Sequence, residues 1–307
     1  MRVLIHCLII VVSSISCCFA DNGSVGNDLQ TRFERLDFEQ DYEGLRSLAE
    51  QQLTFSPNNP ELERWLAIAY FRSGETMRAI ELLSQSLSRA PDVIDNHYAI
   101  GVFAVRRAGE VGITHIRKYL SLAQTHFNHC IELAPDHALA RFYLIRIYQN
   151  APELMGDERD LVNTLQNQLR PLDNTLFQIS KAYEHIEAKD YTQASRLLDH
   201  LSPLQSGDTE APYRSLIAYT NAELALKQKD TDKVVVNATI FIDNNSRWSD
   251  MPDVDGHIFI GQAHALAGDK KAAAESYQQA KHLAQNKRLI NRIERLERKL
   301  QPPKIKK

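Results

Sequence analysis

Glycine is scarce in this chain, and proline rarely interrupts an apolar segment. Only 12 of the 307 residues are glycine and 11 are proline, and the prolines stand mostly between apolar segments. A sheet protein with many tight turns needs more of both residues, whereas helices joined by short turns do not. The composition therefore predicts an all-α fold.

The chain also lacks an excess of either charge and the short motifs that carry catalysis. Its formal net charge is −3, which gives no argument for nucleic-acid binding. It contains no Gly-x-Ser-x-Gly, no His-Glu-x-x-His, no phosphate-binding glycine loop and no Cys-x-x-Cys. We therefore expect no catalytic residues and no cofactor, and a protein that is not an enzyme.

The first twenty residues differ from the rest of the chain. Arg2 supplies their only charge, an apolar run extends from Leu4 to Val12, and small residues lead up to Ala20. This pattern is typical of a secretory signal peptide, and we place its cleavage after Ala20. The apolar run is shorter than the roughly 20 residues of a membrane-spanning helix, so an uncleaved anchor is the less favoured alternative.

Cysteine is nearly confined to this leader. Adjacent cysteines allow a bacterial lipoprotein signal with the lipid on Cys17 or Cys18, although Ser14 stands where an aliphatic residue is usual. After cleavage at Ala20 only Cys130 remains, so the exported chain has no internal disulfide and depends on its core alone. We expect Cys130 to be a buried structural thiol and not a reactive one.

One pattern recurs along the chain: a small or apolar residue, another apolar residue four positions later, and a proline about twelve positions after the first. It occurs at Leu45, Ala49 and Pro57, at Ala79, Leu83 and Pro91, and at Ala123, Phe127 and Pro135. The first two prolines are 34 residues apart and the next interval is 44. The sequence thus predicts a repeat with a basic period of 34 residues, with a ten-residue insertion between Arg107 and Tyr119 in the third copy.

The second copy predicts a complete helix pair. Its first helix carries Leu66, Ala67 and Tyr70, Gly74 forms the turn, the second helix carries Ala79 and Leu83, and Pro91 ends it. Small residues at 67 and 79 let the two backbones approach closely. Gly74 accepts the backbone conformation at the end of the first helix, and proline cannot continue the second.

Later copies are looser but remain in phase. In the third, the first helix is expected to begin around Gly101, with Ala123, Phe127 and Cys130 on the second. The remaining copies are marked by Ala138, Tyr148, Leu161 and Leu165; by Ala182, Tyr191, Ala194 and Leu198; by Ala222, Val234, Ala238 and Phe241; and by Gly261, Gly268, Ala273, Tyr277 and Ala280. One position per copy gives residues 45, 79, 123, 161, 194, 234 and 273, so loop lengths vary while the unit persists.

These residues resemble the tetratricopeptide repeat family over about Asp28 to Gln285. The resemblance implies a right-handed superhelical solenoid of about seven helix pairs, spanning residues 21–285. One more helix over 286–300 would cap it, because Leu289, Ile293, Leu296 and Leu300 fall on one face and arginines on the others. Residues 301–307 should form a disordered tail.

A solenoid of this kind lines its concave side with the first helix of each pair. Positions on the first helices that are not needed for packing are candidates for a partner-binding groove: Arg64, Phe71, Tyr98, Phe142, Arg146, Tyr183 and Tyr219. Aromatic and arginine side chains in a groove suit an extended peptide or a partner helix. The alternative is that part of this set packs in the core.

Charge and histidine are unevenly distributed. Without Arg2 the exported chain has 35 basic and 39 acidic residues. Residues 286–307 alone contain nine basic and only two acidic residues, so the C-terminal end is basic while the rest is acidic. The basic C-terminal helix could contact an anionic membrane surface or an acidic partner, or could simply be a solvated cap. Five histidines lie between His97 and His137, but no acidic or cysteine partner recurs at ligand spacing, so we expect no metal site.

The sequence therefore favours an exported scaffold, most simply periplasmic, that binds a protein or peptide partner in the cell envelope for assembly, secretion or transport. A small-molecule-binding component that partners an envelope transporter is the alternative, and it would need a closed polar pocket. An enzyme hidden in an insertion is disfavoured, because ten residues are too few for a catalytic domain.

Overall fold

A computed structural model describes residues 26–150, 155, 158–201, 211–244, 253–284 and 287–301. Every regular element in these ranges is a helix, so the predicted all-α fold is confirmed. None of the described helices is long and apolar enough to cross a membrane. The expected signal peptide over 1–20, with Cys17 and Cys18, and the tail from residue 302 lie outside the described residues.

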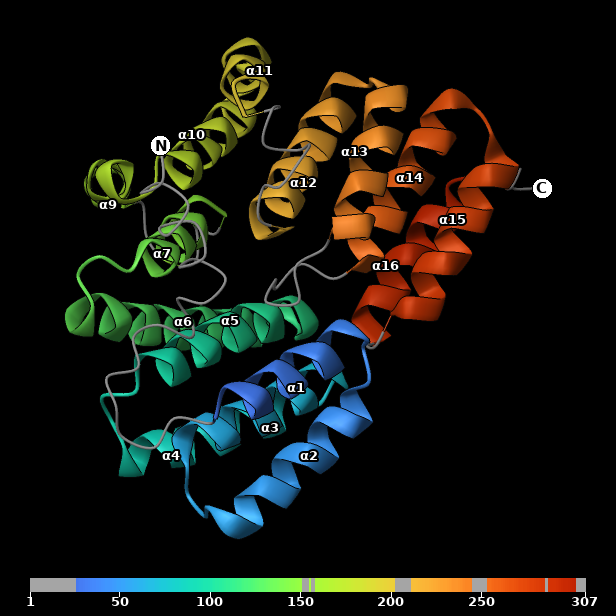
Figure 1. Cartoon of the computed structure of the whole chain (residues 1–307). Helices are drawn as coiled ribbons and strands as arrows, with labels where there is room; N and C mark the ends of the chain where they lie inside the picture. The colour runs from blue at the N-terminus through green and yellow to red at the C-terminus, as the bar shows by residue number, and fades with distance from the viewer. Residues whose placement is uncertain are drawn as a thin grey trace, which may run out of the picture. The chain divides into compact units, whose positions relative to one another are not determined.

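The helices follow one another as pairs, and short turns join the two members of every pair except α7 and α9 (Figure 1). The pairs are α1 (Asn27–Phe38) and α2 (Tyr42–Phe55), α3 (Pro60–Arg72) and α4 (Thr76–Arg89), α5 (Ile94–Glu110) and α6 (Ile113–Leu133), α7 (Ala138–Asn150) and α9 (Arg159–Leu172), α10 (Asn174–Glu187) and α11 (Tyr191–Asp199), α12 (Ala211–Gln228) and α13 (Thr231–Asn244), and α14 (Asp253–Ala267) and α15 (Lys270–Leu283). Helix α16 (Lys287–Arg298) comes last.

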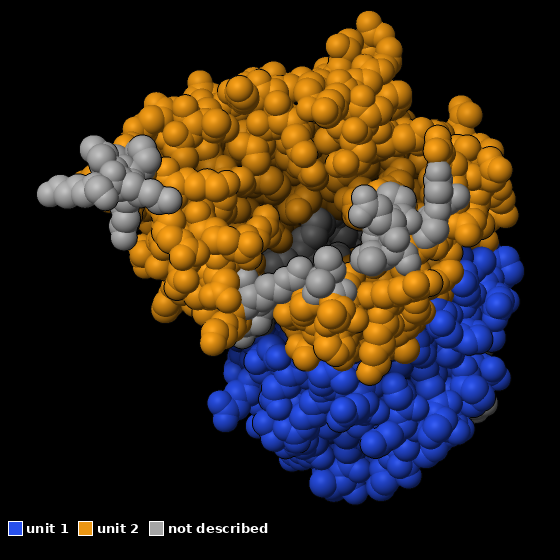
Figure 2. Space-filling model, turned by 180° about the vertical axis from the view of Figure 1, so that it is seen from behind, with its two compact units in different colours: residues 1–104, 125–135 blue, residues 105–124, 136–307 orange. Residues whose placement is uncertain are grey.

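The chain divides into two compact units, which Figure 2 distinguishes by colour. Unit 1 comprises residues 1–104 and 125–135, and unit 2 comprises residues 105–124 and 136–307. The division falls inside α5 and α6, so the long third pair contributes to both units.

The first helix of the third pair begins at Ile94 and not around Gly101. Gly101 lies inside α5, because no proline or other helix-breaking residue intervenes after the turn that contains Pro91. Its missing side chain has a packing role: a Cβ there would lie 2.5 Å from Cε1 of Phe127 on α6. The glycine therefore marks the close approach of two helices and not the start of one.

The ten-residue insertion predicted in the third copy lengthens both helices instead of forming a loop. Helices α5 and α6 have 17 and 21 residues, against 13 and 14 in α3 and α4. No proline occurs between Pro91 and Pro135, so the extra residues can continue the two helices. The turn at Val111 and Gly112 remains short.

The turns inside five of the pairs share one construction, in which a residue with left-handed backbone precedes an acidic residue. The left-handed residues are Gln40, Gly74, Lys189, Lys229 and Gly268, with φ of 58°, 84°, 60°, 62° and 86°. In four of these turns the acidic residue is an aspartate that caps the second helix by accepting a backbone hydrogen bond, as Asp269 does from Ala272 N at 2.9 Å and Asp41 from Gly44 N at 2.9 Å. After Gly74 the residue is Glu75, whose side chain makes no such bond. The predicted turn at Gly74 is confirmed.

The repeat positions form the core in most copies. Ala79 and Leu83, Ala194 and Leu198, and Ala273 and Tyr277 are all 0 or 1% exposed. The fourth copy departs from the predicted register, because Leu161 is 37% exposed while Leu165 and Leu169 are buried. Helix α9 begins only at Arg159, so its apolar side starts one turn later than expected.

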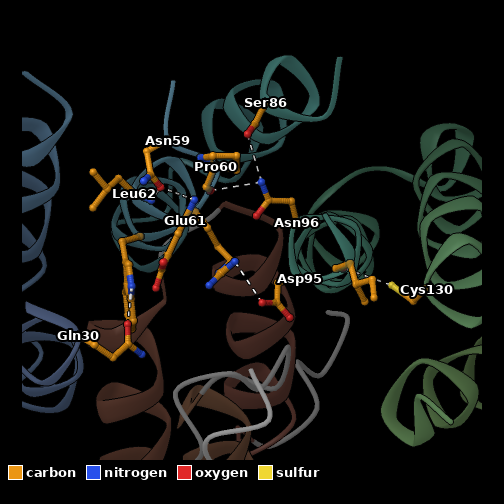
Figure 3. A network of polar contacts seen from close by, with 12 residues as sticks. Gln30, Asn59, Pro60, Glu61, Leu62, Ser86, Asp95, Asn96 and Cys130 are labelled. Atoms are coloured by element: carbon orange, nitrogen blue, oxygen red, sulfur yellow. Dashed lines mark hydrogen bonds and ion pairs between the residues drawn. The ribbon is translucent and has the colours of Figure 1, made fainter. Parts of the chain in front are cut away.

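A buried polar network joins helices within unit 1 (Figure 3). Asn96 on α5 donates to Ser86 Oγ at 3.1 Å and to the backbone oxygen of Pro60 at 3.3 Å. Cys130 on α6 is fully buried, and its thiol donates to the backbone oxygen of Ile94 at 3.6 Å. Burial raises the pKa of Cys130 to about 12, which confirms the predicted structural thiol.

Candidate binding face of unit 2

The first helices of successive pairs form a continuous layer in unit 2. Helix α7 contacts α10, α10 contacts α12, and α12 contacts α14, while α9, α11, α13 and α15 pack as their second helices. We call the side that carries the inward polar residues of this layer the inner face of unit 2. It is defined by Arg146, Tyr183, Tyr219, Glu223 and Asp255, which come from four different helices.

Arg146 on α7 lies over the ring of Tyr183 on α10, with Cζ 3.1 Å from the ring centroid. Tyr183 is 2% exposed and therefore supports the guanidinium from below. Nη1 of Arg146 is buried and has no acceptor among the described residues, and Oε1 of Gln149, one turn later, has no donor there. Since buried polar atoms nearly always have partners, these atoms are suited to a ligand or to water.

Tyr219 and Glu223 stand one turn apart on α12. The Tyr219 ring meets Phe241 and Phe259 edge to face, at centroid distances of 5.3 and 5.2 Å. Burial raises the pKa of Tyr219 well above its usual value. Burial also raises the pKa of Glu223, although the charges of Arg146 and Lys227 oppose that rise. Tyr219 and Glu223 both keep some solvent exposure, so they line the face instead of filling the core.

Asp255 on α14 is the second carboxylate of the inner face, and it is ion-paired with a residue of α16. Its Oδ1 lies 3.0 Å from Nη1 of Arg292. Burial raises the pKa of Asp255, while Arg292 and then Arg106 act in the opposite direction. Asp255 thus has a cation in contact, whereas Glu223 makes no salt bridge within the described part of the chain.

The structure brings together three of the predicted groove residues: Arg146, Tyr183 and Tyr219. The other four are buried in packing: Arg64 (2% exposed, in unit 1), Phe71 (7%, unit 1), Tyr98 (6%, unit 1) and Phe142 (4%, unit 2). Arg64 is ion-paired with Asp95 at 3.2 Å, and Phe71 stacks on Phe103 at 4.3 Å. Partner binding by any of the seven stays a prediction.

The two carboxylates of the inner face were not among the predicted residues. Glu223 could have been predicted, because it lies four positions after Tyr219 and therefore on the same side of the helix. Asp255 could not, since an acid in the first turn of a helix is ordinary.

The predicted histidine group resolves into a small hydrogen-bonded cluster in unit 1. His97 Nε2 lies 2.8 Å from the backbone oxygen of Pro91, and His97 Nδ1 lies 2.8 Å from His126 Nδ1. Since a carbonyl only accepts, Nε2 of His97 is the donor, so its Nδ1 accepts from His126. The His129 ring is 5.1 Å from that of His97. Among the described residues, no group of three or more His, Cys, Asp or Glu is placed to hold a metal ion.

No protein-family model matches the chain, and no curated protein sequence matches it. Solved structures do match. A tetratricopeptide repeat protein from Parabacteroides merdae ATCC 43184 superimposes with a TM-score of 0.54 and 14% identity, over 88% of this chain and 98% of that one. The Cut9–Hcn1 hetero-tetramer of the APC/C superimposes with a TM-score of 0.57 and 12% identity over 85% of this chain. Human IFIT1, a dimer with PPP-AAAA, superimposes with a TM-score of 0.51 and 20% identity over 83% of this chain.

These likenesses show the fold. The chain is a helical-repeat protein with the tetratricopeptide architecture, which confirms the resemblance found in its sequence. It spans about half the length of the Cut9–Hcn1 and IFIT1 chains, 48% and 53% respectively.

Proposed function

We propose that this chain is a non-catalytic scaffold, and that the inner face of unit 2 binds a segment of a partner protein. The observation that supports this is the gathering of Arg146 from α7 with Tyr219 and Glu223 from α12, with Nη1 of Arg146 buried and unpaired. Arginine and tyrosine are the side chains that most often dominate protein interfaces. The Cut9–Hcn1 structure, a hetero-tetramer, supplies a protein of this fold held with a partner chain.

We further propose that the protein is exported and works in the cell envelope, most simply the periplasm, in assembly, secretion or transport. The support is the leader over residues 1–20, with cleavage after Ala20 or lipidation at Cys17 or Cys18. Mass spectrometry of the mature N-terminus distinguishes these outcomes. A chain that begins at Asp21 supports the soluble form, a diacylglyceryl cysteine supports the anchored form, and an intact Met1 in the cytoplasm contradicts export.

Site-specific photocrosslinking in the native cell tests the partner proposal. The crosslinking residue replaces Tyr219 on the inner face or, as control, Val236 on the second helix α13, which is 58% exposed. We expect a discrete adduct from position 219 and none from 236. Adducts from 236 alone, or the same adducts from both positions, would contradict binding at the inner face.

The basic helix α16 supports a separate contact with an anionic membrane surface. Its exposed side carries Lys287, Arg295 and Arg298, while Ile293 on the opposite side is fully buried against the last pair. Each basic residue near an anionic surface contributes about 1 kcal/mol of attraction. Sedimentation with phosphatidylglycerol vesicles but not phosphatidylcholine vesicles is expected, with loss on combined Arg295→Gln and Arg298→Gln substitution. Equal sedimentation of both proteins would contradict this contact.

The alternative function, binding of a small molecule, has one observation in its favour: the inner face collects two carboxyl groups whose pKa burial raises, Glu223 and Asp255. A ligand that binds only the folded chain raises its melting temperature. A screen of cellular metabolites that raises the melting temperature of the wild-type protein but not of a Glu223→Gln variant would favour this alternative over a protein partner.

A further inference from the structure

One carboxylate of the inner face has no cation of its own. Asp255 contacts Arg292 at 3.0 Å, and Glu184 on α10 contacts Lys181 at 2.9 Å. Glu223 on α12, in contrast, forms neither a salt bridge nor a hydrogen bond through its carboxylate with the described residues. A charged group that is largely removed from water normally requires such a partner.

The cations nearest to Glu223 are engaged elsewhere. Arg146 lies against the ring of Tyr183, 3.1 Å from its centroid, and does not approach Glu223 within salt-bridge distance. Lys227, one turn further along α12, is exposed. Burial consequently outweighs their attraction and raises the pKa of the Glu223 carboxyl.

The inner face thus offers a carboxylate acceptor and a donor that have no partner among the described residues. Glu223 supplies the acceptor, and the buried Nη1 of Arg146 supplies the donor. An extended peptide has carbonyl oxygens at every residue, so Arg146 can bind any sequence. Glu223 discriminates, because only a cationic side chain compensates its charge.

We infer that the inner face of unit 2 selects a lysine or arginine side chain of its peptide partner, and that Glu223 is the acceptor for that cation. This inference rests on the proposed function, because it names the partner chemistry of the same face. A free diamine carries the same cationic group without a peptide backbone, so a test must separate the two sources.

The test uses the full exported chain, immobilised, and two pools of acetylated and amidated hexapeptides. The pools are identical except that the central residue is arginine in one and citrulline, its neutral isostere, in the other. Cadaverine serves as the free diamine. The variants are Glu223→Gln, which removes the charge but keeps the shape, and Glu275→Gln, which removes an exposed charge on the second helix α15.

We expect the wild-type protein to retain arginine peptides about tenfold or more above citrulline peptides, the difference for one hydrogen-bonded charge. Glu223→Gln should abolish that preference, whereas Glu275→Gln should keep it. Cadaverine should compete weakly. Retention of both pools without preference overturns this inference but leaves the proposed function standing, and retention of neither pool contradicts both. Full displacement by cadaverine at equal concentration assigns the site to a free amine and overturns the peptide inference.

If the Glu223→Gln variant kept the same preference for arginine peptides, another residue would be the acceptor and the inference would also be overturned. Glutamine at a partly exposed position should not unfold the helix, and circular dichroism of each variant checks this. Glu223→Asp provides the conservative comparison: it keeps the charge on a side chain one methylene shorter, so part of the preference should remain.

Discussion

Helix α3 of unit 1 and helix α12 of unit 2 are both first helices of their pairs, yet their polar side chains are used differently. Every residue of α3 from Glu61 to Phe71 is buried, and Arg64 is ion-paired with Asp95. Helix α12 keeps Tyr219 and Glu223 partly exposed, and Glu223 has no cation in contact. The same repeat can therefore use its polar groups for folding in one place and leave them available for binding in another.

The largest expected difference between the two regions is in how much the free energy of unfolding depends on the contacts of a buried arginine. Asp95→Ala leaves the buried Arg64 guanidinium without this carboxylate and should lower the free energy of unfolding by about 3 kcal/mol. Arg146→Met, in unit 2, should lower it by less than about 1 kcal/mol, because Arg146 has no salt bridge to lose. Urea denaturation of both variants measures this, with Asp95→Asn as the isosteric control. Equal losses would remove the distinction.

A second difference is the size of a pH dependence, which should be greatest at His126 in unit 1, although burial also lowers the pKa of His137 and His257 in unit 2. Burial, and then the neighbouring histidines His97 and His129, lower the pKa of His126 to about 4. Because this folded-state pKa lies below the unfolded value of about 6.5, the unfolded chain takes up its proton first as the pH falls. Stability should be complete above about pH 6.5 and decrease by about 2 kcal/mol toward pH 4, with allowance for partial exposure.

The His126→Gln variant should make that pH profile shallower between about pH 6.5 and 4, while His97, His137 and His257, whose pKa burial also lowers, keep part of the slope. His115→Gln, at an exposed position in the same helix α6, is the matched control and should leave the profile as in the wild type. Denaturant titrations at several pH values measure both variants. A profile that stays steep without His126 would assign the acid sensitivity to other groups.

Packing between paired helices should be alike in the two regions. A Cβ at Gly101 would lie 2.5 Å from Phe127, and a Cβ at Gly261 would lie 2.4 Å from Tyr277. Alanine at either position should therefore cost about 1–2 kcal/mol through overpacking. Gly109, in α5, has no atom within 4 Å of its built Cβ, so alanine there should be neutral or stabilising. Melting temperatures give the comparison, and unequal costs at Gly101 and Gly261 would contradict equivalent packing.

The smallest expected effect has the opposite sign. Glu223→Gln should leave the free energy of unfolding unchanged or raise it by up to about 0.5 kcal/mol, because a raised pKa means that the charged form opposes folding. The same argument predicts that the unfavourable contribution of Glu223 fades as the pH falls toward its raised pKa. A loss of more than about 1 kcal/mol would show instead that Glu223 holds the fold together.

The sequence predicted the helix pairs where strong local signals coincide. Gly74 and Gly268 were predictable turn positions, because glycine accepts the left-handed conformation that both adopt. Gln40, Lys189 and Lys229 adopt the same conformation but were not recognised, since their residue types carry no such signal. The aspartate that follows each of the three is the regular feature that could have revealed them.

The candidate site was less predictable than the fold, because it depends on contacts between distant residues. Arg64 and Arg146 are both predicted from the sequence as groove residues on first helices. In the structure, however, Arg64 is buried and ion-paired with Asp95, which lies 31 positions later in the chain. Nothing near Arg146 in sequence indicates that it will lie on Tyr183. Which arginines remain available is decided by the partners that the stacked helices bring together.

Hydrogen exchange of the full exported chain, with and without the partner recovered by crosslinking at position 219, tests the central claim most directly. The account predicts slower exchange in α10 (Asn174–Glu187) and α12 (Ala211–Gln228), and unchanged exchange in α3 (Pro60–Arg72). Protection confined to α3, or to second helices such as α13, would contradict a binding face on the first helices of unit 2.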